Sequence, residues 1–106
     1  MPTYMMEPPA RYNHPYDGQV IEQVMSPAQV AMICVSHGAF GAACSWKHNG
    51  VCHILLPKGD ELLLAFYRRH EMAHCNGWSY WHTSGHMEEI GKPKPSHKGG
   101  VQLRLE

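Results

Sequence analysis

The sequence predicts a small α+β domain, in which a short mixed or antiparallel sheet is backed by one helix and faced by a second helix. Three observations favour this fold class. The predicted elements follow one another as strand, helix, hairpin and helix. Asn49-Gly50 lies between two apolar runs, which is typical of a two-residue hairpin turn. A stretch of good helix formers runs from 62 to 75 and stops before Gly77.

The composition is that of one domain, and we expect residues 1–106 to fold together. Nine basic residues balance nine acidic residues, and the basic residues form no long stripe. This argues against a nucleic-acid partner. No apolar run is long enough to cross a bilayer, and no signal peptide is visible, so we expect no membrane partner either. The oligomeric state is left open.

The first part of the chain predicts an arm, a strand and a buried helix. Residues 1–18 hold four prolines and a closing Asp-Gly turn, so we expect an irregular arm, either a linker or a segment lying across a cleft. Residues 19–25 predict a short strand. Ser26 is a typical N-cap and Pro27 a typical first helical residue. The helix that follows is apolar nearly all round, which predicts burial, and it ends by Gly38.

The hairpin joins predicted strands 41–46 and 51–56, and Pro57 ends the second of them. The second strand is apolar on both faces except at His53, which fits a strand covered on both sides by helices. His53 either lines a cleft or is a half-buried structural histidine. A last short strand is predicted over 101–105, inside a mobile tail over 91–106.

The second helix is expected to start at an Asp60 N-cap and to run over 62–75. Its predicted apolar stripe consists of Leu62, Leu63, Ala65, Phe66, Arg69 and Ala73. After Gly77, two tryptophans and a tyrosine within residues 78–81 predict an aromatic lid over the core, or else a wall for a substrate.

The last turns of this helix contain the pattern H-E-x-x-H, from His70 to His74. Residues four apart share one face of a helix, so both imidazoles can reach one metal ion. Glu71 lies about 100° further round the helix, which suits a general base acting on a water molecule polarised by Zn²⁺. The pattern therefore predicts a zinc site of the kind that hydrolyses peptides.

A catalytic zinc site needs a third protein ligand and one open position. Metzincins place a glycine and then a histidine three and six residues after the second histidine of the pattern. Here Gly77 matches the glycine, but Tyr80 stands where the third histidine would be. We expect His82 as the third ligand, reached by a slightly longer loop after Gly77. The alternatives that stay open are His86, Glu88 and Glu89.

The chain resembles zincin-type metallopeptidases. It is most similar to small bacterial and phage-associated metalloproteins with the signature R-H-E-x-A-H-x-N-G-W and a histidine four residues after the tryptophan. Residues 69–78 and His82 carry that signature here. The resemblance covers residues 28–82, including an upstream cysteine pair and the Leu56-Pro57 strand end. It implies a minimal zincin-like domain with His82 completing the metal site, and it implies no particular substrate.

The four cysteines, Cys34, Cys44, Cys52 and Cys75, form no C-x-x-C, which argues against a cysteine zinc ribbon. The spacing of Cys34 and Cys44 suits a disulfide that joins a helix end to the following strand. Such a bridge predicts a secreted or periplasmic protein, and its absence a cytoplasmic one. The alternative is four cysteines buried as small apolar residues.

The expected function is a zinc-dependent metallopeptidase acting on a peptide or protein, with His70, His74 and His82 as ligands and Glu71 as general base. Tyr80 or His53 is a candidate for oxyanion stabilisation. An edge strand would align the substrate by strand addition. Two alternatives remain open. One is a metal-binding accessory module with little proteolysis, in which a group such as Asp17 or His97 fills the fourth metal position. The other is an amidase that acts on cell-wall peptide.

Overall fold

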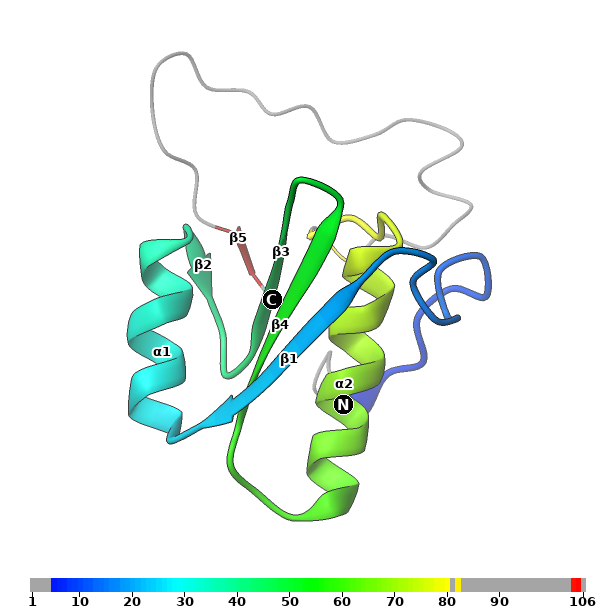
Figure 1. Ribbon diagram of the computed structural model, residues 1–106. Coiled ribbons are helices and arrows are strands. Elements are labelled where there is room, and N and C mark those ends of the chain that lie inside the picture. The colour runs from blue at the N-terminus through cyan, green and yellow to red at the C-terminus, as the bar shows by residue number, and fades with distance from the viewer. Residues whose placement is uncertain (1–4, 81, 83–103, 106) are drawn as a thin grey trace.

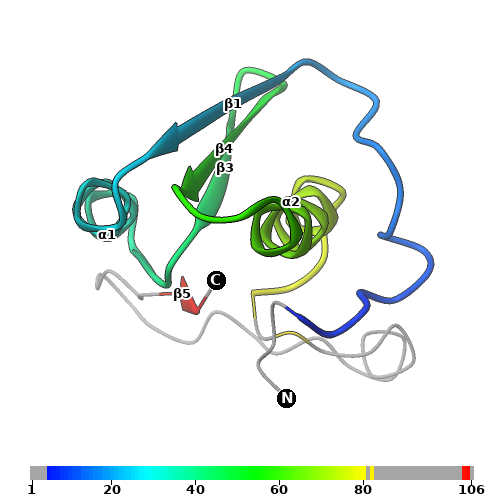
Figure 2. The same cartoon turned by 90° about the horizontal axis from the view of Figure 1, so that it is seen from below.

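The computed structural model describes residues 5–80, 82 and 104–105, and a sheet flanked by two helices forms its centre (Figure 1). In chain order the elements are β1 (Val20–Met25), α1 (Pro27–Ser36), β2 (Ala39–Phe40), β3 (Cys44–His48), β4 (Val51–Pro57), α2 (Glu61–Cys75) and β5 (Arg104–Leu105). Seen from below, α1 and α2 lie on opposite sides of the sheet (Figure 2). The predicted α+β class, with one helix on each face, is confirmed.

The sheet has the order β1-β4-β3, and β4 is its central strand. β1 runs parallel to β4, whereas β3 runs antiparallel to it, so the sheet is mixed. The β3–β4 hairpin turns at Asn49 and Gly50, whose φ angles of 52° and 80° are the positive values that a type I′ turn requires. The central position of β4 explains why its sequence is apolar on both faces.

Successive β4 side chains face the two helices in turn. Those of Cys52, Ile54 and Leu56 belong to one apolar cluster, together with Leu64 and Cys75 of α2. Leu55 belongs to a second cluster, with Val30 and Cys34 of α1 and with Ala39 and Cys44. The sheet therefore separates two small apolar cores, one between the sheet and α2 and the other between the sheet and α1.

α1 begins as predicted at Ser26, whose side chain accepts a hydrogen bond from the backbone of Gln29 while the Gln29 side chain accepts one from Ser26 N–H. The prediction that this helix is buried all round is wrong. Only Val30 and Cys34 are buried, and Met32 is 74% exposed. One side of α1 covers the sheet, and no described segment covers the other.

α2 also begins at its predicted cap, because the Asp60 side chain accepts a hydrogen bond from Leu63 N–H at 2.8 Å. Its predicted apolar stripe is wrong at Leu62, which is 69% exposed, and at Ala65, which is also exposed, whereas Leu64 is 8% exposed. The buried face of α2 instead runs through Leu64, Glu71 and Cys75, with both motif histidines also buried. The buried face of α2 thus includes three polar residues of the motif, which the predicted apolar stripe does not contain.

The described part of the N-terminal arm contains no α-helix or strand, in keeping with the predicted irregular arm, but it packs closely against α2. Asn76, at the C-cap of α2, donates hydrogen bonds from its side-chain amide to the carbonyl oxygens of Tyr12 and His14. The Tyr16 hydroxyl donates to Gly50 O in the hairpin turn. Figure 2 shows the arm passing round the side of α2 that faces away from the sheet.

β2 and β5 form a separate two-stranded parallel sheet. The last strand predicted over 101–105 is therefore confirmed at Arg104–Leu105, while residues 101–103 lie outside the described residues. The mobile tail predicted over 91–106 otherwise also lies outside them. Neither described helix has the length and apolar character that crossing a membrane requires.

Two disulfides tie the helices to the sheet. The predicted Cys34–Cys44 bridge joins α1 to the start of β3. A second bridge, Cys52–Cys75, joins β4 to the last residue of α2. Cys75 directly follows His74, so the second disulfide fixes the end of the helix that carries the H-E-x-x-H pattern.

Candidate metal centre

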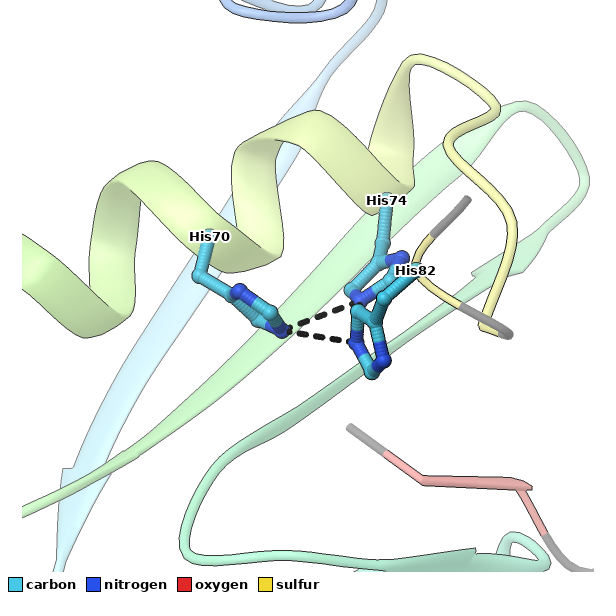
Figure 3. A group of neighbouring side chains, drawn as sticks. All are labelled: His70, His74 and His82. Carbon is cyan, nitrogen blue, oxygen red and sulfur yellow. Dashed lines mark hydrogen bonds between the residues drawn. The ribbon is translucent and has the colours of Figure 1, made fainter. Parts of the chain in front are cut away.

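Three histidines meet at the C-terminal half of α2. His70 and His74 lie one turn apart on the helix, and His82 comes from the segment that follows it (Figure 3). The Nε2 atoms of His70 and His74 are 3.1 Å apart, and the Nε2 atom of His82 is 3.1 Å from His70 and 3.2 Å from His74. Within the described residues, these three form a group that can hold a metal ion.

The size of this triangle fits a small tetrahedral ion. Zinc binds imidazole nitrogens at about 2.0–2.1 Å, which places neighbouring nitrogens of a tetrahedron about 3.3–3.4 Å apart. The distances between the Nε2 atoms fall only slightly short of this. Three protein ligands leave one position of a tetrahedron for another group, which is the arrangement of a catalytic rather than a closed structural site.

The chain after α2 turns back sharply to deliver His82. Gly77 has a φ of 101°, which a residue with a side chain rarely adopts, and this ends the helix. Trp78 N–H donates back to Ala73 O, and His82 N–H donates to Ser79 O at 2.8 Å. His82 itself has a φ of 57°, in the left-handed region. Two left-handed residues therefore make the extra reach of the loop possible.

The hydrogen bond of His74 Nδ1 determines that Nε2 is the His74 nitrogen that faces His70 and His82. His74 Nδ1 lies 2.9 Å from the carbonyl oxygen of Trp78, so it carries the hydrogen and donates it. A neutral His74 therefore turns the bare lone pair of Nε2 toward the other two rings. Hydrogen bonds alone do not satisfy three mutually close nitrogens, whereas one shared cation accepts all three lone pairs.

Aromatic rings enclose the three imidazoles. Trp78 is 5% exposed, and its ring centroid lies 5.0–5.1 Å from those of all three histidines. Tyr80 stacks on His74 with a centroid distance of 4.4 Å. Tyr12 of the arm and Ala73 close the cluster around Trp78. The predicted aromatic lid is thus found at Trp78, and the arm is part of its support; Trp81 lies outside the described residues.

Burial favours the neutral form of His70 and His82. Burial, together with the nearby His82 and Arg69, lowers the pKa of His70 to about 4. Burial also lowers the pKa of His82. Neutral imidazole is the form that binds metal, so a cation binding near pH 7 does not have to displace protons from these two rings.

Glu71 lies beneath the site rather than among the ligands. It is 1% exposed, and its Oε1 accepts a hydrogen bond from the Ser45 hydroxyl at 2.8 Å. Ser45 belongs to β3 and is fully buried. The Ser45 carbonyl oxygen in turn accepts a hydrogen bond from the Tyr80 hydroxyl. A strand residue that the sequence did not single out therefore contacts both Glu71 and the ring that stacks on His74.

Two candidates for oxyanion stabilisation come out differently. The prediction that His53 stabilises the oxyanion is wrong. Its ring stacks on Trp46 with a centroid distance of 5.3 Å, and Leu55, on the same face of β4, packs toward α1. That face is opposite to the metal centre. Tyr80 does lie beside the histidines, although its hydroxyl is directed to Ser45 O. Asp17 is not grouped with the described ligand atoms. The remaining candidates, His86, Glu88, Glu89 and His97, lie outside the described residues.

Sequence reasoning missed Ser45, the Cys52–Cys75 pairing and the role of Asn76. The one sequence feature that points to Ser45 is its polar side chain within the otherwise apolar predicted strand 41–46.

Comparison with protein-family models, with curated proteins and with solved structures gives no match.

Proposed function

We propose that this protein is a zinc-dependent metallopeptidase. The observation that carries the proposal is the convergence of three buried or half-buried imidazole Nε2 atoms at 3.1–3.2 Å, with a buried carboxylate on the residue next to the first ligand. His70, His74 and His82 would hold the ion. When bound, zinc supplies a Lewis acid that polarises a carbonyl group and makes water a nucleophile near neutral pH.

Glu71 is the general base in this proposal. It accepts a proton from the attacking water and then returns it to the amine that leaves. Its position on α2 between the two helical ligands, and its burial under β3, support this role because proton transfer needs a carboxylate held in one place. The Tyr80 ring stacks on His74, one of the proposed ligands, while its hydroxyl donates to Ser45 O.

The sheet supports a peptide or protein as the substrate. β3 pairs only with β4 among the described strands, so its other edge is the one to which an extended peptide would add, although the Ser45 carbonyl oxygen on that edge accepts the Tyr80 hydroxyl. That edge lies beside the metal centre, because the Ser45 carbonyl oxygen contacts Tyr80. An extended peptide paired with β3 would pass the three histidines.

The two disulfides support an oxidising, secreted or periplasmic setting.

One observation favours a second function, a metal-binding accessory module with little proteolysis. Glu71 is 1% exposed and already accepts a hydrogen bond from Ser45. A carboxylate buried for structural reasons would have the same environment. The two functions differ in what Glu71 does for catalysis, and they do not differ in metal binding.

The test compares the wild type, Glu71→Gln and an exposed control, Glu61→Gln, each loaded with one equivalent of zinc. Cleavage of a fluorogenic peptide library is measured together with bound zinc. The peptidase predicts that Glu71→Gln keeps its zinc and loses at least about 10²-fold in cleavage rate, while Glu61→Gln cleaves like the wild type. Equal cleavage by Glu71→Gln and the wild type would refute the role of Glu71, and a zinc-loaded wild type that cleaves nothing would favour the accessory module.

A further inference from the structure

We propose that Ser45 is a positioning residue for the general base: its hydroxyl holds the Glu71 carboxylate in the orientation that proton transfer needs. This inference rests on the proposed function. The contact that carries it joins two side chains that lie far apart in the sequence. Ser45 Oγ donates to Glu71 Oε1 at 2.8 Å, and the two residues are 0% and 1% exposed.

The chemical surroundings make this hydroxyl unusual. Ser45 pairs with Ile54 across the hairpin, and the β4 side chains on the α2 side of the sheet are Cys52, Ile54 and Leu56. A strand facing such a core normally presents an apolar side chain to it. A buried carboxylate, in contrast, needs hydrogen-bond donors. The polar residue on β3 stands where the strand meets the carboxylate of α2.

Ser45 also lies on a rigid part of the fold. Its neighbour Cys44 is joined to α1 by a disulfide, and β3 is paired with β4 along its whole length. The Ser45 carbonyl oxygen accepts the Tyr80 hydroxyl, and the Tyr80 ring stacks on His74. One residue therefore connects the general base, through its side chain, and the metal centre, through its backbone.

Fixing one carboxylate oxygen has a specific consequence. The Glu71 side chain has several rotatable bonds, and a hydrogen bond to a rigid strand selects one orientation of the carboxylate plane. Loss of the hydroxyl removes the hydrogen bond to Glu71 but none of the three histidine ligands, so the histidines and their metal should stay in place. It should reduce only those events in which Glu71 takes part.

The test uses cobalt(II) in the metal centre and acetohydroxamic acid as the probe, because the absorption of cobalt reports binding without a substrate. A hydroxamate chelates the metal and shares a proton with an adjacent carboxylate. We compare Ser45→Ala, Ser45→Thr, Glu71→Gln and the exposed control Ser36→Ala. We expect Ser45→Ala to bind one metal ion and to bind the hydroxamate about tenfold more weakly, which is the usual size of an outer-shell effect. Ser45→Thr keeps the hydroxyl and should restore the affinity, as should Ser36→Ala.

The outcomes separate this inference from the function on which it rests. Weaker hydroxamate binding by Glu71→Gln with unchanged binding by Ser45→Ala overturns the role of Ser45 alone. Unchanged binding by Glu71→Gln overturns the proposed general base, and the role of Ser45 with it. If Ser45→Ala does not fold, the isosteric pair Ser45→Thr and Ser45→Val decides: equal affinities for the hydroxamate overturn the inference. Where a substrate is found, Ser45→Ala should lower kcat with KM unchanged.

Discussion

Removing the Cys52–Cys75 disulfide should weaken metal binding, whereas removing Cys34–Cys44 should not. The double variants Cys52→Ala/Cys75→Ala and Cys34→Ala/Cys44→Ala form a matched pair, because each deletes one bridge between a helix and the sheet. Only Cys52–Cys75 ends beside a predicted metal ligand, since Cys75 follows His74. Cys34–Cys44 instead holds α1, which contributes no ligand to the three-histidine group.

The expected loss of stability follows from the lengths of the closed loops. The cysteines are 23 residues apart in Cys52–Cys75 and 10 apart in Cys34–Cys44. Loop-closure entropy then gives contributions of roughly 3 kcal/mol for each bridge, slightly more for the longer loop. The two variants should therefore be destabilised by similar amounts, which makes stability a control for the comparison of zinc affinity.

The assays are urea denaturation of the metal-free proteins and competition for zinc with a chromophoric chelator. We expect both variants to lose similar stability and Cys52→Ala/Cys75→Ala alone to lose about tenfold in zinc affinity, at the low end of what changes around metal ligands cause. Equal zinc affinities in the two variants would refute the reasoning that the bridge at the end of α2 orders His74.

Three further predictions concern the arm, the histidines and the lid. Asn76→Ala removes the side-chain amide that donates to Tyr12 O and His14 O. It should lower the free energy of unfolding by about 1–2 kcal/mol and weaken zinc binding. Thermal denaturation measures the first effect and chelator competition the second, and an unchanged melting temperature would contradict the contact. Folding lowers the pKa of His70 to about 4, so below pH 6.5 the unfolded chain binds a proton that the native chain does not. The metal-free protein should lose roughly 3 kcal/mol from this residue between pH 7 and pH 4, a loss that His70→Gln should abolish in urea titrations at several pH values. Trp78→Leu removes the ring that touches all three imidazoles and should weaken zinc binding about tenfold. The control Trp46→Leu, on the other face of the sheet, should leave zinc affinity within about twofold of the wild type.

The features that the sequence predicted well depend on neighbours in the chain. Asn49-Gly50 determines a turn by its own backbone preferences, and Ser26 and Asp60 cap helices that start within three residues of them. His70 and His74 share a helix face because of helix geometry alone. The expectation of His82 as the third ligand depends on its distance along the chain from Gly77 and on the resemblance to the signature of residues 69–78.

The features that it missed depend on contacts between distant segments. Ser45 and Glu71 are 26 residues apart, and Asn76 reaches back 64 residues to Tyr12. Leu62 is apolar, but Leu64, about 200° further round α2, packs against the sheet, and this leaves Leu62 69% exposed. His53 is the polar exception on an apolar strand, which makes it a candidate for the site. The alternation of side chains along β4, however, directs His53 to the α1 side of the sheet, opposite to the metal centre.

The most direct test of the metal centre is the zinc content of the purified protein, measured by mass spectrometry for the wild type, His82→Ala and the control His53→Ala. His53 is a histidine of the same domain that lies on the opposite face of the sheet, so it controls for nonspecific binding of zinc to imidazole. A site built from His70, His74 and His82 predicts about one zinc per chain in the wild type and in His53→Ala, and its loss from His82→Ala. Full zinc retention by His82→Ala, or a wild type that binds no zinc when it is supplied, would contradict the three-histidine site.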